Sequence, residues 1–441
     1  MPTLRDLTRA GLWTGLYVLL ALFPLLLLLA APAPRGGGFA DELASGLGFL
    51  ALSVMAMQFL LTARFPWLAP PLGADLVYAF HRHVTAIALL FALLHPLLLF
   101  GRALLSSGLL LPWATSWEIG AGVVSLYALL LLTLTSAARR LLRIPYDGWR
   151  RAHGLLAAAA VLLGLWHAAL AGRLLSRPVV RWPFFVWILA WVALLVRVRV
   201  LRPLALRRRP WTVAAVRPER GDAVTLVLEP VGHPGLRFRG GQFVWLTLGD
   251  SPFSGREHPF SISSSSQAAP RLELTVKALG DFSRRAQATR PGAVAYVDGP
   301  HGTMSFDDFP DADGHVFLAG GIGMAPCLSM LRTLADRGDR RPHLAIHATG
   351  SWDRTPFREE LAALAGRLQL QVVHVVEAPP DGWTGERGRV TEALLDRWLP
   401  RGGRHGYFLC GPGPMMDEVE RALARLGVPL GDLHAERFDL V

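Results

Sequence analysis

Two stretches of the sequence decide the fold: YAFHRHVTAIALLFALLHPLLLF, residues 78–100, and AHGLLAAAAVLLGLWHAALA, residues 152–171. Each is about as long as the ~20 residues that a helix needs to cross the hydrocarbon core of a bilayer. Four further apolar runs of similar length lie near residues 11–31, 43–63, 117–137 and 182–200. Breaks rich in proline, glycine and arginine separate the runs. The N-terminal half is therefore predicted to be a bundle of six transmembrane helices.

The composition of the 441-residue chain agrees with a membrane protein, because apolar residues make up 52% and charged residues only 18%. The net charge of +11 is uneven: residues 1–210 carry 20 basic and 6 acidic side chains, and residues 211–441 carry 25 and 28. A basic excess in the apolar half favours juxtamembrane arginines over nucleic-acid binding. The two cysteines, Cys327 and Cys410, are too few for a disulfide framework or a cysteine-rich metal site.

The distribution of arginines predicts the orientation of the six spans. With a cytoplasmic N-terminus, the inside segments carry 15 arginines and the outside loops carry 5. The positive-inside rule then places the N-terminus and the C-terminal half in the cytoplasm, with the bundle in the cell (plasma or inner) membrane. The first run could instead be a cleaved signal peptide, but a signal core usually has only ~7–15 apolar residues.

Four histidines in two predicted spans form pairs with one spacing. His81 and His95 are 14 positions apart, and so are His153 and His167. At ~100° and ~1.5 Å per residue, each pair lies on one face of its helix, roughly 21 Å apart along the axis. The two spans run in the same direction, so His81 matches His153 in depth and His95 matches His167. Ionisable residues inside spans are usually functional, and neutral imidazole ligates haem. The pattern predicts two stacked haems: an inner one between His81 and His153, and an outer one between His95 and His167.

Other interpretations of these histidines remain. Interhelical hydrogen bonding would also place imidazoles inside the bundle. Zinc or copper fits less well, because the two pairs are too far apart to share one ion. His83 is 12 positions from His95 and therefore points away from the shared face. It is predicted to be a polar residue near the cytoplasmic interface.

The pattern of apolar and polar residues changes near residue 210. Short alternating runs separated by glycine and proline predict an antiparallel β-barrel, and from about residue 315 apolar strands alternate with helices, which predicts a parallel α/β sheet. We expect three domains: residues 1–205, 206–312 and 313–441.

Two motifs in the predicted barrel suit a flavin. The first follows an apolar strand and offers an aromatic ring, hydroxyls and exposed amides in a turn: His258, Pro259, Phe260, Ser261, Ile262, Ser263 and Ser264. The second passes from a strand into a helix, whose N-terminal N–H groups form an anion site for pyrophosphate. Its residues are Lys277, Gly280, Asp281, Phe282 and Ser283.

Two motifs in the α/β part suit a dinucleotide. A glycine-rich turn between an apolar strand and a helix lets a pyrophosphate approach the backbone: Gly320, Gly321, Ile322, Gly323 and Pro326. A similar turn ends another apolar strand at Cys410, Gly411 and Pro412. After the second strand, Arg354 and Arg358 are candidates to bind a 2′-phosphate, whereas Asp353 would prefer a ribose hydroxyl. This balance slightly favours NADPH over NADH.

The motifs, in this order, resemble the ferric reductase and NADPH oxidase superfamily, in particular its compact bacterial members, over almost the whole chain. The resemblance implies a six-helix transmembrane haem domain followed by a ferredoxin-reductase-like module, a flavin barrel plus a nucleotide-binding α/β domain. It implies FAD, two b-type haems and NADPH or NADH as cofactors. It also implies that Phe438, near the C-terminus, stacks on the isoalloxazine and moves for hydride transfer. Cys410 would then lie near the reactive carbon of the nicotinamide; alternatively it is a buried small residue.

The expected function is electron transfer from cytoplasmic NAD(P)H through FAD and both haems to an external acceptor. Oxygen, giving superoxide, is favoured because the predicted outer loops hold no clear cluster of metal ligands. A ferric chelate also fits, as does a membrane cytochrome that donates electrons to a partner protein, or a haem or flavin sensor. The expected partners are the nicotinamide donor, the acceptor and the lipid bilayer, without nucleic acid.

Overall fold

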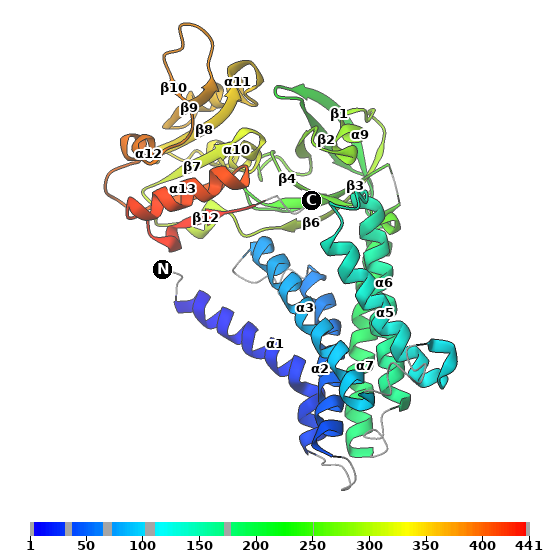
Figure 1. Cartoon of the computed structure of the whole chain (residues 1–441). Coiled ribbons are helices and arrows are strands. Elements are labelled where there is room, and N and C mark those ends of the chain that lie inside the picture. Colours follow the sequence, from blue (N-terminus) through cyan, green and yellow to red (C-terminus); the bar gives the residue numbers. More distant parts are fainter. Residues whose placement is uncertain are drawn as a thin grey trace. The chain divides into compact units, whose positions relative to one another are not determined.

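The computed structural model describes residues 4–30, 38–64, 73–101, 111–171, 178–249 and 251–437. The chain divides into two compact units (Figure 1). The helical unit contains Thr8–Leu72 and Leu76–Pro203, and the sheet unit contains Leu204–Val441. The finer boundaries of three domains stay a prediction.

Long apolar helices form the helical unit: α1 (Leu4–Ala30), α2 (Phe39–Thr62), α3 (Gly73–Phe100), α5 (Trp117–Ala137), α6 (Tyr146–Ala171) and α7 (Pro178–Val196). Among the described residues, five helices are long and apolar enough to cross a membrane. These five are α2, α3, α5, α6 and α7 with its continuation to Arg207, whereas α1 contributes a shorter apolar stretch, Gly11–Leu27. The helical membrane region is thus confirmed, and the span formed by the first run stays a prediction.

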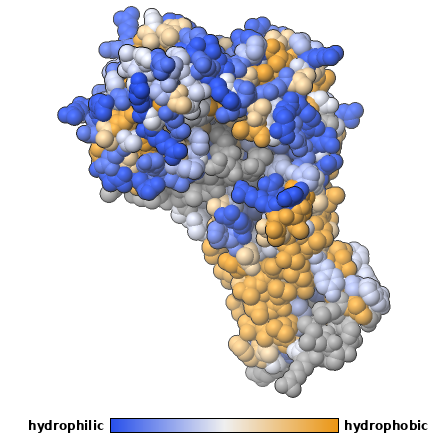
Figure 2. Space-filling model, turned by 45° about the horizontal axis from the view of Figure 1, so that its top comes forward, coloured by the Kyte–Doolittle hydropathy of each residue, from blue (hydrophilic) through white to orange (hydrophobic). Residues whose placement is uncertain are grey.

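Apolar side chains lie on both the inside and the outside of this bundle. The core includes Met57, Val161 and Phe184. Large apolar residues at the middle of helices are nevertheless exposed, among them Leu155 at 74% and Leu189 at 66%. Figure 2 shows the resulting hydrophobic surface of the helices. Apolar surface of this extent, on helices long enough to cross a bilayer, is typical of lipid-facing helices.

The first sheet of the sheet unit has six antiparallel strands in the order β4-β3-β6-β1-β2-β5. Its strands are β1 (Trp211–Glu219), β2 (Ala223–Pro230), β3 (Phe243–Leu248), β4 (His258–Ser261), β5 (Leu272–Lys277) and β6 (Val294–His301). Their inward-facing residues, such as Leu226, Leu246 and Leu274, form one core. A short helix, α9 (Asp281–Gln287), follows β5. The predicted antiparallel sheet is confirmed.

The second sheet is parallel, in the order β10-β9-β8-β7-β11-β12. Its strands are β7 (Gly314–Gly320), β8 (His343–Ser351), β9 (Leu370–Ala378), β10 (Glu386–Arg387), β11 (His405–Cys410) and β12 (Leu433–Ala435). Helices α10 (Met324–Asp336) and α11 (Arg358–Ala365) cover one face, and α12 (Glu392–Trp398) and α13 (Gly413–Arg425) cover the other. The strand order reverses between β7 and β11, and such a switch point forms the ligand crevice of open α/β sheets.

Candidate functional site

The four predicted haem ligands form two pairs across α3 and α6. The ring centroids of His81 and His153 are 6.3 Å apart, and those of His95 and His167 are 6.2 Å apart. A metal–imidazole bond is about 2 Å long. The ring centre lies about 1.1 Å beyond the ligating nitrogen. Two imidazoles on opposite sides of one metal ion therefore have ring centroids about 6 Å apart. Both pairs therefore fit an iron held between two rings.

Hydrogen bonds orient three of these rings. The Nδ1 of His95 lies 2.8 Å from the carbonyl oxygen of Ala44, and the Nδ1 of His167 lies 2.9 Å from that of Glu118. A carbonyl only accepts, so Nδ1 donates in both rings and Nε2 keeps its lone pair. The Nδ1 of His153 lies 3.2 Å from the Ser136 hydroxyl. An imidazole in this tautomer is ready to ligate a metal through Nε2.

The remaining histidine of α3 does not join either pair. His83 is exposed, and its Nδ1 donates to the Ala79 carbonyl one turn earlier at 2.7 Å. Over the described ranges, no group of three or more His, Cys, Asp or Glu could hold a metal ion. A bis-histidine haem needs only two protein ligands, so this finding leaves the pairs as the candidate sites.

The predicted flavin motif begins on β4 and continues into a buried loop. Strand β4 pairs with β3, and the ring of His258 stacks on that of Phe282 at 4.2 Å. Phe260 lies 5.7 Å from the same ring. Pro259 and Ser261 are partly exposed on this strand, whereas Ile262 is fully buried. The structure thus brings the two predicted flavin segments together at one aromatic cluster.

The serines after β4 contact protein rather than open space. Ser263 and Ser264 are buried, and the Ser264 hydroxyl accepts the N–H of Glu273 at 3.1 Å. Their carbonyls accept hydrogen bonds from α10: Ser329 donates to Ser264 at 2.7 Å, and Arg332 donates to Ser263 at 2.7 Å. The carbonyls of these two serines thus attach the flavin segment to α10, and the contact of the Ser261, Ser263 and Ser264 hydroxyls with a ligand stays a prediction.

The turn into α9 offers fewer free donors than expected. The buried Ser283 hydroxyl oxygen accepts the N–H groups of Leu279 at 2.9 Å and Gly280 at 2.8 Å. Asp281 starts the helix and pairs with Arg284 at 2.6 Å. Lys277 ends β5, in register with Ala223 of β2. The side chain of Ser283 thus satisfies the N–H groups of Leu279 and Gly280, and an anion site at the start of α9 stays a prediction.

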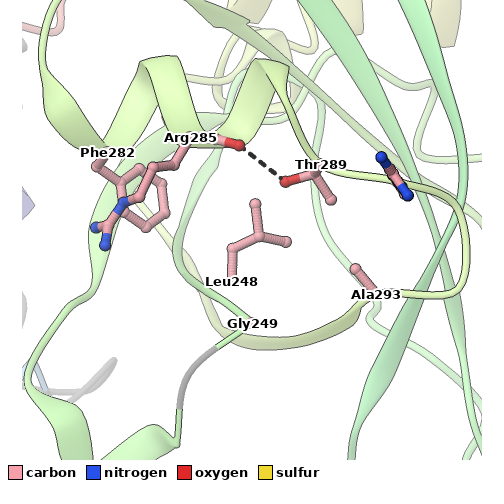
Figure 3. A pocket seen from close by; sticks show the side chains of 7 residues that line it. Leu248, Gly249, Phe282, Arg285, Thr289 and Ala293 are labelled. Atoms are coloured by element: carbon pink, nitrogen blue, oxygen red, sulfur yellow. Dashed lines mark hydrogen bonds between the residues drawn. The ribbon is translucent and has the colours of Figure 1, made fainter.

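A cavity of about 290 Å³ adjoins the same helix (Figure 3). Its lining includes Phe282 of the flavin motif and two arginines, Arg285 and Arg290. Arg285 lies over the Phe282 ring at 5.8 Å, and its carbonyl accepts the Thr289 hydroxyl at 3.1 Å. The two arginines were not among the predicted site residues. The signal for Arg285 was the basic end of a short helix next to a predicted anion site, whereas Arg290 lies three residues beyond that helix.

The two glycine-rich turns meet at the switch point. Cys410 of β11 is in register with Ala319 of β7. A Cβ on Gly320 would lie 2.6 Å from Pro412, and one on Gly323 would clash with the Cys410 carbonyl. These two glycines therefore allow the loops to pack together. Gly321 has φ +54° and open space around its α-carbon, so a pyrophosphate could approach the chain there, although its carbonyl already accepts a hydrogen bond from His347 at 3.0 Å.

The other residues of these turns differ in burial: Pro326 and Cys410 are buried, Ile322 and Gly411 are half-buried, and Pro412 is exposed. Pro326 lies in the first turn of α10, Ile322 packs on the adjoining core, and Gly411 has its α-carbon against Gly320. Burial raises the pKa of the Cys410 thiol well above 9.0, with Cys327 and Glu436 adding to the shift. Burial also raises the pKa of Cys327 to about 12. Both thiols are neutral at physiological pH, so neither is a thiolate nucleophile.

Arg354 follows β8 and forms an ion pair with Asp222 of the β1–β2 turn. Arg358 lies over the Trp352 ring at 4.7 Å and donates to the Trp352 carbonyl at 3.1 Å. Arg354 is still 62% exposed, so its guanidinium can exchange partners at low cost. The sequence alone did not indicate that Asp222 competes for it.

The C-terminal segment reaches the first sheet. After β12, the N–H of Glu436 donates to the Leu409 carbonyl at 3.1 Å. A Cβ on Gly302 would lie only 2.6 Å from Glu436 Oε1, so the Glu436 carboxylate lies beside Gly302. Phe438 lies outside the described residues. The described chain thus ends beside the loop that follows β6.

Comparisons with known proteins match both units. Residues 47–164 match the family model of the ferric reductase-like transmembrane component, and residues 317–421 match that of the oxidoreductase NAD-binding domain. Ferredoxin–NADP reductase B of Sorangium cellulosum is 31% identical over 239 residues, which are 52% of this chain and 96% of that protein. The glycine betaine monooxygenase reductase subunit of Chromohalobacter salexigens is 30% identical over 46% of this chain, which spans only 56% of that relative.

The FAD/NAD-binding domain of nitric oxide dioxygenase from Vibrio cholerae matches 52% of this chain and 98% of its own, with 21% identity and a TM-score of 0.47. A flavohaemoglobin from Malassezia yamatoensis matches 90% of this chain and 98% of its own, with 18% identity and a TM-score of 0.46. The protein is a membrane oxidoreductase with an FAD- and NAD(P)H-binding module, and it belongs to the ferric reductase and NADPH oxidase superfamily.

Proposed function

We propose that this protein carries electrons from cytoplasmic NAD(P)H, through FAD and two b-type haems, to oxygen on the other side of the membrane, giving superoxide. One reduced nicotinamide supplies two electrons as a hydride, two oxygen molecules take one electron each, and one proton is released in the cytoplasm. The observation that carries the proposal is the pair of ring separations, 6.3 Å and 6.2 Å, at two depths of one bundle.

The histidines would hold the haems through Nε2. Carbonyls of α2 and α5 hold the Nδ1–H of His95 and His167, and Ser136 contacts the Nδ1 of His153. A bound haem would supply one-electron carriage at each level. Lipid-facing helices around the pairs would exclude water from the electron path. Interhelical hydrogen bonding alone does not require that the rings face each other at this distance.

The sheet unit would bind FAD at the aromatic cluster of His258, Phe260 and Phe282, and NAD(P)H at the glycine turns. Helix α10 connects the two sites, because its N-terminus starts at Gly323 and its side chains hold the loop of Ser263 and Ser264. The cavity beside Phe282, with Arg285 and Arg290, suits the negatively charged diphosphate part of FAD.

Phe438 is proposed to cover the isoalloxazine and to move aside for hydride transfer. The support is the position of Glu436, two residues earlier, beside Gly302 in the loop that follows β6. Cys410, neutral and buried at the switch point, would contact the nicotinamide as a small uncharged side chain. The measurable consequence is that Phe438→Ala would loosen nicotinamide discrimination without loss of FAD.

We further propose that the protein resides in the plasma or inner membrane with the sheet unit in the cytoplasm. The support is the excess of arginines, 15 against 5, in the segments that would then lie inside. Protease protection of tagged termini in sealed vesicles tests this orientation. A C-terminal tag that is accessible from outside the cell would refute it.

A ferric chelate is the second candidate acceptor, because the matched membrane family is named for ferric reductases. A partner protein is the third. Reduction of cytochrome c that is sensitive to superoxide dismutase, run beside a ferric-chelate assay on the purified chain, separates the three. Cytochrome c reduction that superoxide dismutase abolishes supports oxygen as the acceptor. Chelate reduction without superoxide supports ferric iron, and reduced haems without either product support a partner protein.

A further inference from the structure

The outer histidine pair is supported in the same way on both sides. His95 donates to the carbonyl of Ala44 on α2, and His167 donates to the carbonyl of Glu118 on α5. Each of these two helices has a glycine one turn after the carbonyl: Gly48 on α2 and Gly122 on α5.

Neither glycine leaves room for a Cβ beside the imidazole ring that packs against its helix. A Cβ on Gly48 would lie 2.7 Å from Nδ1 and 2.9 Å from Cε1 of His95. A Cβ on Gly122 would lie 2.8 Å from Nδ1 and 2.9 Å from Cγ of His167. Real Cβ atoms do not approach other atoms this closely, so any larger residue would displace the ring. Glycine inside a helix lowers the stability of that helix by about 1 kcal/mol relative to alanine. Here the absence of a side chain leaves space for the imidazole ring.

The same contacts recur because the bundle repeats a two-helix arrangement. His81 and His153 are 72 positions apart, as are His95 and His167. The carbonyls of Ala44 and Glu118 are 74 positions apart, and so are the glycines that follow them. Helices α2 and α3 therefore present to the outer site the arrangement that α5 and α6 present from the opposite side.

The inner pair lacks this symmetry. Thr62 and Ser136, also 74 positions apart, each donate to the carbonyl four residues earlier, at 2.9 Å and 2.6 Å. Ser136 also contacts His153, but the Nδ1 of His81 has no hydrogen-bond partner within the described part of the chain. The carbonyl-and-glycine support is thus a feature of the outer pair.

We propose that Gly48 and Gly122 are positioning residues for the outer haem. Their missing side chains let His95 and His167 lie against the backbone of α2 and α5, where the carbonyl of each helix fixes the Nδ1–H tautomer and turns Nε2 toward the iron. The inference rests on the proposed function, since it concerns the geometry of a haem site in this bundle. Outer-shell contacts of this kind are worth about 10–100-fold in metal affinity.

The test uses the full chain, purified in detergent, with Gly48→Ala and Gly122→Ala. Gly46→Ala is the matched control on α2, because its Cβ would lie 3.4 Å from the flexible end of Leu25. Gly148→Ala is the control on α6, where a Cβ meets no atom within 4 Å. The readouts are haem per FAD by pyridine haemochrome, the midpoint potential of each haem, and the low-spin EPR signals.

We expect each glycine variant to lower the occupancy of the outer haem about tenfold or more. Where the outer haem stays bound, we expect a shift only in its own midpoint potential and EPR signal, which are those that His95→Ala removes. The inner component should keep its potential and signal, which also shows that the bundle is folded. Unchanged signals for both haems would overturn the inference, and so would loss of both haems together. Wild-type protein without two bis-histidine haems would overturn the proposed function instead.

Discussion

Replacing Arg332 with methionine tests the connection between the flavin loop and the nucleotide-binding sheet. Arg332, on α10, is only 19% exposed. Its guanidinium donates to the Ser263 carbonyl at 2.7 Å, to Glu273 at 2.8 Å, and to both carboxylate oxygens of Glu360 at 2.5 and 2.7 Å. Methionine keeps the packing of the aliphatic part of the arginine side chain. It leaves the half-buried carboxylates of Glu273 and Glu360 without this cation.

Removing one partner of a buried ion pair costs about 3–5 kcal/mol. Glu273 keeps its contact with Arg217, so we expect the lower end, about 3 kcal/mol. For a folding unit of this size, that lowers the midpoint of thermal unfolding by about 6–12 °C. The assay is the release of FAD fluorescence on heating the full chain in detergent.

The matched control is Arg367→Met, whose arginine is 55% exposed and pairs with Asp336 at 2.9 Å. An exposed pair contributes less than about 1 kcal/mol, so this control should shift the midpoint by no more than about 4 °C. Equal midpoints for the two variants would refute the structural reasoning about Arg332.

Three further predictions concern the parallel sheet. Burial lowers the pKa of both His315 and His343, so the unfolded chain binds protons below about pH 6.5 while the folded sheet does not. The two histidines therefore lower the free energy of unfolding only below pH 6.5, by up to about 1.4 kcal/mol per pH unit for each histidine. Thermal unfolding measured from pH 8 to 5 checks this, and an unfolding midpoint that does not change with pH contradicts it. Cys410 should react with iodoacetamide only after unfolding, as mass spectrometry can measure, and rapid labelling of native protein at pH 8 would count against its raised thiol pKa. Arg354→Ala should lower the NADPH-to-NADH ratio of kcat/KM by roughly tenfold, or about 1.4 kcal/mol, and an unchanged ratio would argue against its contact with a 2′-phosphate.

Most of the fold could be predicted from the sequence because its signals are local. Apolar runs near the length of a bilayer predict spans, and a 14-step spacing of histidines predicts one helical face. The pairing of His81 with His153 followed from the direction of two spans, and the structure brings these rings together. The strand-and-glycine pattern around Gly320 and Cys410 likewise predicted a shared crevice.

The contacts that could not be predicted join residues distant in sequence. The hydrogen bond from Ser329 to Ser264 joins residues 65 positions apart, and the ion pair of Arg354 with Asp222 joins residues 132 apart. A Ser-rich run reads the same whether its hydroxyls face a ligand or the protein, because only tertiary packing decides between the two. The position of Gly48 beside the ring of His95 could not be predicted either. A glycine in an apolar helix has no periodic signal, and only the packing of the helices shows what lies beside it.

The most direct test of the electron path is the haem content and redox spectrum of the purified full chain. We predict two low-spin, bis-histidine b-type haems per FAD, both reduced by NAD(P)H. His81→Ala or His153→Ala should remove the inner haem, His95→Ala or His167→Ala the outer one, and His83→Ala neither. One haem per chain, or a spectrum without bis-histidine ligation in the wild-type protein, would contradict the two-haem path.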